Sequence, residues 1–281
     1  MRGGCFNLVS GSVDWGKTSL DYVSYRHGQP ESFFRKLFSL GVGLPGQYIL
    51  DVGTGTGLIA RKFARSGAFV AGIDVSEHQI RVARETTNAE NLTVDFKVAK
   101  AEAIPFLNDS FDCVISSNSW QYFDKVKAVN EIKRILRPNG LLVICYFSWL
   151  PRLDNVARAS ENLALKFNPY WERENWNNSA EIDDLVKLGG VIVPFSSDSQ
   201  GDVTLRGMFF YDVEIPYTRE EWRGRMRASR GIGASLSEEQ VVAFDEEHKE
   251  LLYRITDDEF TVKHRVDAHI YSFKEFIQNH A

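Results

Sequence analysis

The chain has 281 residues, of which 43% are hydrophobic and 25% charged, as is ordinary for a soluble globular protein of one large domain, with or without an insert. The net charge of −5 and the lack of a long basic run argue against a nucleic acid substrate. The N-terminus has no signal-peptide pattern and no apolar run reaches ~18 residues, so we expect a cytoplasmic protein without membrane attachment.

Strands alternate with helices between residues 47 and 147, after a polar lead-in. This alternation predicts an α/β fold: a doubly wound, mostly parallel sheet covered by helices on both faces. The clearest helix follows Asp124, its expected N-cap. Its expected apolar stripe comprises Val126, Val129, Ile132 and Leu136. The expected strands in this region are 48–52, 69–73, 94–98, 111–116 and 141–147.

A glycine-rich loop follows the first strand. Asp51-Val52 runs into Gly53-Thr54-Gly55-Thr56-Gly57, and an amphipathic helix comes next. Glycine at every second position allows positive φ angles and lets a nucleoside-sized ligand approach bare backbone. The unpaired amides at the start of the helix face the same ligand. A dinucleotide fingerprint would place its third glycine at position 58, where this chain has Leu58.

A second apolar run ends in Gly72-Ile73-Asp74-Val75, with Asp74 placed 21 residues after Gly53. An acid at the tip of the second strand suits the two hydroxyls of a ribose. The alternative is that Asp74 caps the next helix, but Ser76 is better placed for that. We therefore interpret Asp74 as a ribose ligand.

Four segments together resemble the class I S-adenosylmethionine (SAM) dependent methyltransferases, in the branch that includes ubiquinone-biosynthesis and small-molecule methyltransferases. They are ILDVGTGTG at 49–57, GIDVS at 72–76, AEAIPFLNDSFDCVISSNS at 101–119 and EIKRILRPNGLLVI at 131–144. They occur in the family's order and at its spacing. The resemblance implies a seven-stranded Rossmann-like sheet, SAM as the cofactor, and in-line transfer of its methyl group to a small-molecule acceptor.

The resemblance also implies which residues contact the cofactor. They are Asp51, Gly53, Thr54, Gly55 and Gly57 in the loop, Asp74 and Val75 at the ribose, Ala101 and Glu102 at the adenine edge, and Ser117 and Asn118 at the sulfonium end. The family usually has Asp before the Ala-Glu pair, but this chain has Lys100, which cannot accept a bond from the adenine amino group. Arg26 stands in a segment that closes over the cofactor in the family. Its guanidinium matches the methionine carboxylate, and a surface arginine is the equal alternative.

The resemblance divides the chain into four parts. They are an N-terminal lid segment at 1–44, the SAM-binding α/β core at 45–147, a variable substrate cap at 148–200, and closing strands at 201–281 with a helical insert at about 218–255. The expected closing strands are 208–215 and 266–273. In the insert, Thr218-x-x-Glu221 and Ser237-x-x-Gln240 are capping boxes that predict two helices.

An aromatic cluster falls in the predicted cap. Its members are Trp149, Phe167, Tyr170, Trp171 and Trp176. They predict an apolar, helical lid over the acceptor, and the alternative is a helix that buries them against the sheet. Arg223, Arg225, Arg227 and Arg230 follow in the insert. The favoured interpretation pairs these arginines with nearby acids; the other makes them a clamp for an anionic acceptor.

A weakly acidic hydroxyl or carbon-acid acceptor would need a general base, for which His27, Tyr25, Tyr22 and Tyr146 are candidates. The histidines show no metal-ligand spacing, so we expect no metal. Two other functions stay open: an NAD-linked oxidoreductase, against which Leu58 counts, and a non-catalytic SAM-binding module, which would often lose the loop glycines. The identity of the acceptor, the atom methylated and the oligomeric state are not specified by the sequence.

Overall fold

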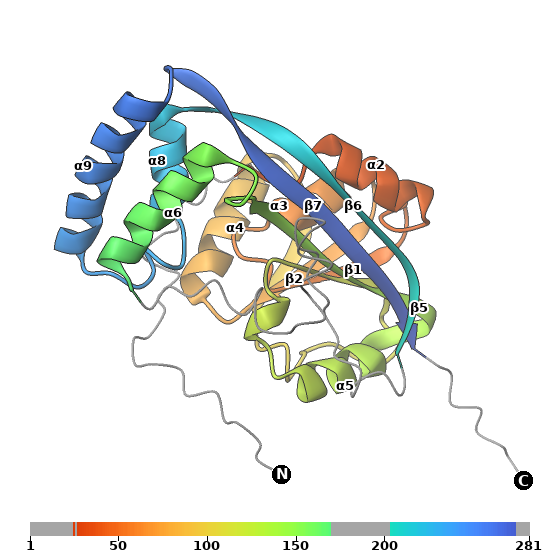
Figure 1. Ribbon diagram of the computed structural model, residues 1–281. Coiled ribbons are helices and arrows are strands. Elements are labelled where there is room, and N and C mark those ends of the chain that lie inside the picture. The colour runs from red at the N-terminus through yellow and green to blue at the C-terminus, as the bar shows by residue number, and fades with distance from the viewer. Residues whose placement is uncertain (1–24, 26, 170–202, 274–281) are drawn as a thin grey trace, which may run out of the picture.

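The computed structural model describes residues 25, 27–169 and 203–273, and at its centre lies a seven-stranded sheet (Figure 1). The strand order is β3-β2-β1-β4-β5-β7-β6. The strands are β1 Tyr48–Val52, β2 Phe69–Asp74, β3 Val94–Val98, β4 Phe111–Ser117, β5 Leu136–Trp149, β6 Val203–Thr218 and β7 Glu259–Phe273. The first five pair in parallel, while β7 runs antiparallel to both of its neighbours. The doubly wound, mostly parallel sheet that the sequence predicts is therefore confirmed.

Helices bury apolar side chains on both faces of the sheet. The described helices are α2 Glu31–Ser39, α3 Leu58–Arg65, α4 Glu77–Ala89, the short η2 Trp120–Tyr122, α5 Lys125–Ile135, α6 Asn155–Phe167, α8 Arg219–Arg227 and α9 Glu238–Ile255. On one face α2, α3 and α4 contribute Phe33, Phe63 and Ile80 to the core. On the other face α5 contributes Ala128 and Ile132. Within the described residues, none of the helices has both the length and the apolarity that crossing a bilayer requires.

Local capping signals set the helix starts. The side chains of Asp124 and Ser76 accept from the backbone amides of Lys127 and Gln79, and both predicted N-caps are confirmed. The two predicted capping boxes also form, at the starts of α8 and α9. The stripe predicted for α5 is partly wrong. Val126 is 71% exposed, and Leu136 begins β5 instead of ending the helix, so the buried residues are Ala128, Ile132 and Ile135.

A helical cap, formed by α6, α8 and α9, lies at one end of the long strands β6 and β7 (Figure 1). β5, β6 and β7 are all longer than the sequence predicts, because their pairing continues out to Trp149 opposite His264 and to Thr218 opposite Glu259. The cap has its own apolar core, centred on Trp222 and Phe244. Trp149 and Phe167 of the predicted aromatic cluster belong to that core. The other three members, Tyr170, Trp171 and Trp176, lie outside the described residues.

Gly72 in β2 gives a test of the packing beneath the glycine loop. An added Cβ would lie 2.8 Å from the Phe96 ring and 2.9 Å from Thr54 Oγ1. We expect Gly72→Ala to lower the free energy of unfolding by ~1–3 kcal/mol, because the core there has no room to relax. Gly207→Ala in β6 is the control, since a Cβ at Gly207 meets nothing within 4 Å. Urea unfolding measures both, and equal losses in the two variants would contradict the packing described.

Candidate functional site

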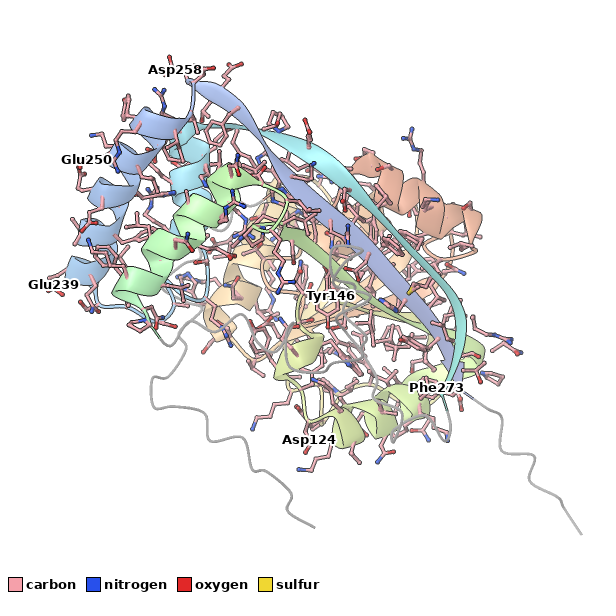
Figure 2. All side chains as sticks on the ribbon, viewed as in Figure 1. Asp124, Tyr146, Glu239, Glu250, Asp258 and Phe273 are labelled. Atoms are coloured by element: carbon pink, nitrogen blue, oxygen red, sulfur yellow. The ribbon has the colours of Figure 1, made fainter. Side chains whose placement is uncertain are left out.

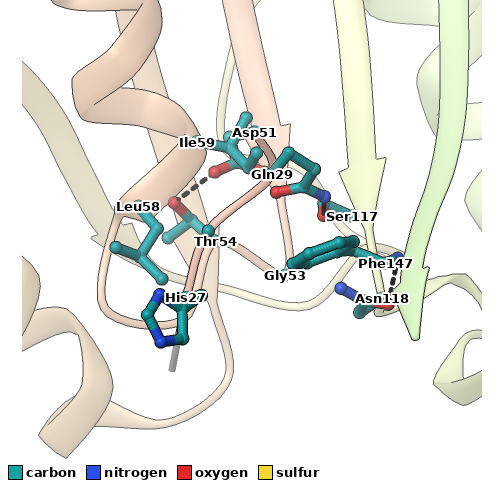
Figure 3. A pocket seen from close by; sticks show the side chains of 11 residues that line it. His27, Gln29, Asp51, Gly53, Thr54, Leu58, Ile59, Ser117, Asn118 and Phe147 are labelled. Atoms are coloured by element: carbon teal, nitrogen blue, oxygen red, sulfur yellow. Dashed lines mark hydrogen bonds between the residues drawn. The ribbon is translucent and has the colours of Figure 1, made fainter. Parts of the chain in front are cut away.

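A cavity lies where β1 and β4 end and α3 begins (Figure 3). It holds about 390 Å³ of empty space, including the part open to solvent. The residues that line it come from the lead-in, the glycine loop, the start of α3 and the ends of β4 and β5. They are His27, Gly28, Gln29, Asp51, Gly53, Thr54, Leu58, Ile59, Ser117, Asn118 and Phe147. Six of the predicted site residues are thus brought together here: His27, Asp51, Gly53, Thr54, Ser117 and Asn118.

The glycine loop adopts positive φ at each of its three glycines, 72° at Gly53, 55° at Gly55 and 78° at Gly57. A Cβ at Gly53 would lie 2.5 Å from the Cβ of Ser119, so the side chain of Ser119 occupies that space. At Gly57 a Cβ would lie 2.8 Å from the Phe96 ring. These two glycines therefore let the loop pack tightly on its neighbours. Gly57 is the N-cap of α3 and provides no side-chain cap, so the first amides of α3 stay available to a ligand.

Asp51 is the acidic residue among those that line the cavity, and it is only 1% exposed. Its Oδ2 accepts a hydrogen bond of 2.6 Å from the Thr54 hydroxyl, while its Oδ1 has no hydrogen-bond partner in the protein. Burial raises the pKa of Asp51 to about 7, with the Thr54 bond acting in the opposite direction. An ammonium group in the cavity would satisfy Oδ1 and favour the ionised carboxylate. The amino-acid tail of SAM carries such a group, so the residues present fit this cofactor.

Gln29 and Phe147 line the cavity although the sequence does not point to them. The Gln29 amide donates 2.6 Å to Ser117 Oγ and lies 4.0 Å from Cys145 Sγ, which ties the lead-in to β4 and β5. Asn118, with φ 54°, accepts from the Phe147 amide through Oδ1 at 3.1 Å (Figure 3). These contacts join segments that are far apart in the sequence. The local motifs therefore give no signal for them; only the position of Gln29 just before helix α2 could have drawn attention to it.

Asp74 lies beside the glycine loop but does not line the cavity. Its Oδ2 accepts from the Gly55 amide at 3.0 Å, and its Oδ1 accepts from the Ser76 amide at 2.9 Å. Burial raises the pKa of Asp74, against these backbone hydrogen bonds. A carboxylate has about four acceptor positions, so both oxygens can still accept from a ribose. Val75, the other residue predicted at the ribose, is exposed.

The predicted adenine edge is also outside the cavity. Ala101 is buried in the core on the α5 face. Glu102 accepts from the Asp124 amide through Oε1 at 2.7 Å, which fixes the turn before α5. Lys100 is exposed. The contact of Glu102 with adenine stays a prediction that relies on its second oxygen.

The candidate bases lie in different surroundings. His27 stands at the cavity mouth, with its ring edge-on to Tyr217 at 4.8 Å, and partial burial lowers its pKa. It is therefore neutral near pH 7 and able to accept a proton. Burial raises the pKa of Tyr146, so its phenol stays protonated near neutral pH. The Tyr25 ring packs against Gly224 of α8. Arg26 and Tyr22 lie outside the described residues.

The predicted arginines of α8 have two kinds of partner, an acidic side chain and an aromatic ring. Arg223 and Arg227 share Asp245, at 3.2 Å and 2.7 Å from Oδ1, as the favoured interpretation of these arginines predicts. Arg225 is buried and its guanidinium lies 4.5 Å from the centre of the Trp149 ring. Within the described parts of the chain, His, Cys, Asp and Glu form no group of three that could hold a metal ion.

Comparison with known proteins matches residues 50–144 to a family model described as a methyltransferase domain. The methyltransferase GfsG of Streptomyces halstedii is 39% identical over 118 residues, 41% of this chain and 42% of that protein. The ubiquinone biosynthesis O-methyltransferase of Dinoroseobacter shibae is 30% identical over 144 residues, 51% of this chain and 58% of that protein. The chain thus spans about half the length of these relatives.

Among solved structures, the phosphoethanolamine N-methyltransferase 2 of Haemonchus contortus, in complex with S-adenosylhomocysteine (SAH), superposes with a TM-score of 0.52 at 21% identity. The match covers 96% of this chain and 62% of that one. At this identity the likeness shows the fold.

The raised pKa of Asp51 predicts a pH dependence of cofactor binding. The free protein keeps the Asp51 proton up to about pH 7, whereas the ammonium group of SAM favours the ionised carboxylate. SAM affinity should therefore rise between about pH 5.5 and about pH 7, with a slope approaching roughly tenfold per pH unit at the acid end. Calorimetry over this range measures the slope. Asp51→Asn should bind SAM more weakly and without the slope; an equal slope in both proteins would exclude Asp51 as its source.

Proposed function

We propose that residues 50–144, which match a methyltransferase domain, form a class I SAM-dependent methyltransferase domain with SAM as its cofactor, and that the whole protein transfers the methyl group of SAM to a small-molecule acceptor. One observation carries the proposal: the loops of the matched domain converge on a cavity in which a buried carboxylate oxygen, Asp51 Oδ1, has no protein partner. The ammonium group of the SAM amino-acid tail would donate a hydrogen bond to this oxygen. The matches to methyltransferases also favour this function over the NAD-linked alternative.

When bound, SAM supplies a methyl group on a positively charged sulfur that leaves readily. The residues of the chain hold the tail, align the acceptor and exclude water. Holding two reactants in line can lower the barrier by ~7–11 kcal/mol without covalent catalysis. We assign tail binding to Asp51, Gly53 and the α3 amides, and the methyl end to Ser117 and Asn118.

The N-terminal segment is assigned the role of a lid. Its support is the contact between Tyr25 and α8, where Gly224 leaves room for the Tyr25 ring and a Cβ would overlap it. Glycine in a helix interior costs ~1 kcal/mol relative to alanine, so its presence favours a need for close approach. Through this contact the lead-in that carries His27 and Gln29 is held between the cap and the cavity.

An oxygen acceptor is the best-supported choice. The relative from Dinoroseobacter shibae is an O-methyltransferase of ubiquinone biosynthesis, and its match covers 51% of this chain. A hydroxyl acceptor loses a proton during transfer, so a base is needed. His27 is one candidate at the cavity mouth, because its lowered pKa keeps it neutral.

Asp74→Ala tests the ribose assignment. The substitution removes an acceptor for two ribose hydroxyls and also releases the Gly55 amide. We expect SAM affinity, measured by calorimetry, to fall at least tenfold. Asp95→Ala, on the surface of neighbouring β3, is the control and should bind SAM normally. Unchanged affinity in Asp74→Ala would contradict the assignment.

The proposed function as a whole is tested by binding and turnover. Calorimetry with SAM, SAH and NAD should give binding for the first two alone. Protein incubated with methyl-labelled SAM and a bacterial metabolite extract should release SAH and a labelled product. Binding of NAD in preference to SAM would support the oxidoreductase instead. Tight SAM binding without any labelled product would indicate a non-catalytic module.

A further inference from the structure

A buried polar pair lies on the α5 face of the sheet, beside the end of β5. Asp267 and His269 are neighbours on one side of β7, and each is 2% exposed. Asp267 is directly opposite Tyr146 of β5. Tyr271, next along the same side of β7, stacks on the His269 ring with 8° between the planes.

Neither member of the pair is satisfied by the protein. Asp267 Oδ1 and His269 Nε2 have no hydrogen-bond partner, and they lie 3.6 Å apart. That separation is too long for a direct bond, yet one oxygen atom can lie ~2.8 Å from both. Burying such groups without partners destabilises a fold by ~1–3 kcal/mol each. Apolar side chains would serve packing better, so the pair indicates a role in binding.

The position of the pair relates it to the methyl end of the cavity. Tyr146 stands between Cys145, which is next to Gln29, and Phe147, which lines the cavity. The last residue of β4, Ser117, pairs with Cys145, so β4 ends one residue before the level of Tyr146. Tyr146 lies between the helical cap and α5 (Figure 2). Tyr146 packs on the α5 face of the sheet, whereas Cys145 and Phe147 pack on the face of α2 and α3. A group held by Asp267 therefore lies one strand position beyond the end of β4, on the α5 face.

Both members of the pair are neutral near pH 7, because burial disfavours their charged forms. Burial raises the pKa of Asp267 to about 8, and Arg265 on the same strand lowers it in part. Burial lowers the pKa of His269 to about 4. Arg265 itself is held by Asp212 of β6. The other titratable groups that act here are Tyr146, Tyr271 and Cys145, and burial raises the pKa of each, so they are uncharged at neutral pH. Tyr122 of η2 also acts on Tyr146.

We propose that Asp267 and His269 form the acceptor subsite, and that they bind the hydroxyl of a planar ring, a phenol or an enol, and take its proton during methyl transfer. His269 Nε2 accepts the proton as the acceptor O–H bond breaks. The same oxygen forms the new bond to the methyl carbon, and the electron pair of the broken carbon–sulfur bond stays on sulfur. The rings of Tyr146, Tyr271 and His269 give flat walls that suit a planar ring. The inference rests on the proposed methyl transfer.

The test combines two variants with two kinds of measurement. Asp267→Leu and His269→Phe remove the polar atoms and keep the branched shape and the planar ring, respectively. We expect SAH affinity, measured by calorimetry, to stay within about twofold of wild type. We expect transfer of label from SAM into a bacterial metabolite extract to fall at least ~100-fold. Mass spectrometry of the wild-type product should place the methyl group on oxygen.

Stability separates the proposal from a structural role. If the pair is kept for binding, the melting temperature of both variants should be unchanged or higher, because an unsatisfied buried group has been removed. A fall of ~4 °C or more would overturn the proposal. Asp95→Leu, at an exposed position, and His78→Phe, at a half-buried position on α4, are the matched controls and should keep full transfer.

The remaining outcomes are also decisive. Unchanged transfer in both variants, or a product methylated on nitrogen or sulfur, would overturn the acceptor subsite while leaving the proposed function in place. Failure of the wild-type protein to bind SAH, or to transfer label at all, would remove the proposed function, and this inference with it.

Discussion

The site depends on the tight turn between β1 and α3. Its three glycines take positive φ, and the lack of a side chain at Gly53 and Gly57 lets Ser119 and Phe96 pack against the backbone. Asp74 holds the same turn from the end of β2 through the Gly55 amide. Because parallel strands end at one edge of the sheet, this turn, the end of β2 and the end of β4 are brought together. A change that loosened the turn would affect all of them.

Asp51 provides an acidic group in the cavity beside that turn. Its carboxylate is buried with one oxygen bonded and one without a partner, and its pKa is raised as a result. An isolated buried carboxylate lowers stability, and under the proposed function the ammonium group of SAM would complete this site. Asp267 and His269, on the other side of β5, present a second set of unsatisfied buried atoms. We interpret the two sets as the two ends of one reaction, with the cofactor tail at the first and the acceptor at the second.

The elements governed by local rules were predictable from the sequence. β1 and β3 have the predicted bounds, and Ser76, Asp124, Thr218 and Ser237 cap the helices that they were expected to cap. The contributions of Gln29, Phe147 and the Asp267–His269 pair were not predictable, because they arise from contacts between segments that are far apart in the sequence. β5, β6 and β7 are longer than predicted for the same reason, because each strand continues only where it pairs with a neighbouring strand.

The account is tested most directly by a crystal structure of the protein with SAH. It predicts the amino group of SAH within hydrogen-bond distance of Asp51 Oδ1, the ribose hydroxyls at Asp74, and the sulfur directed past Asn118 toward Tyr146. SAH bound elsewhere, or bound with its amino group away from Asp51, would contradict it.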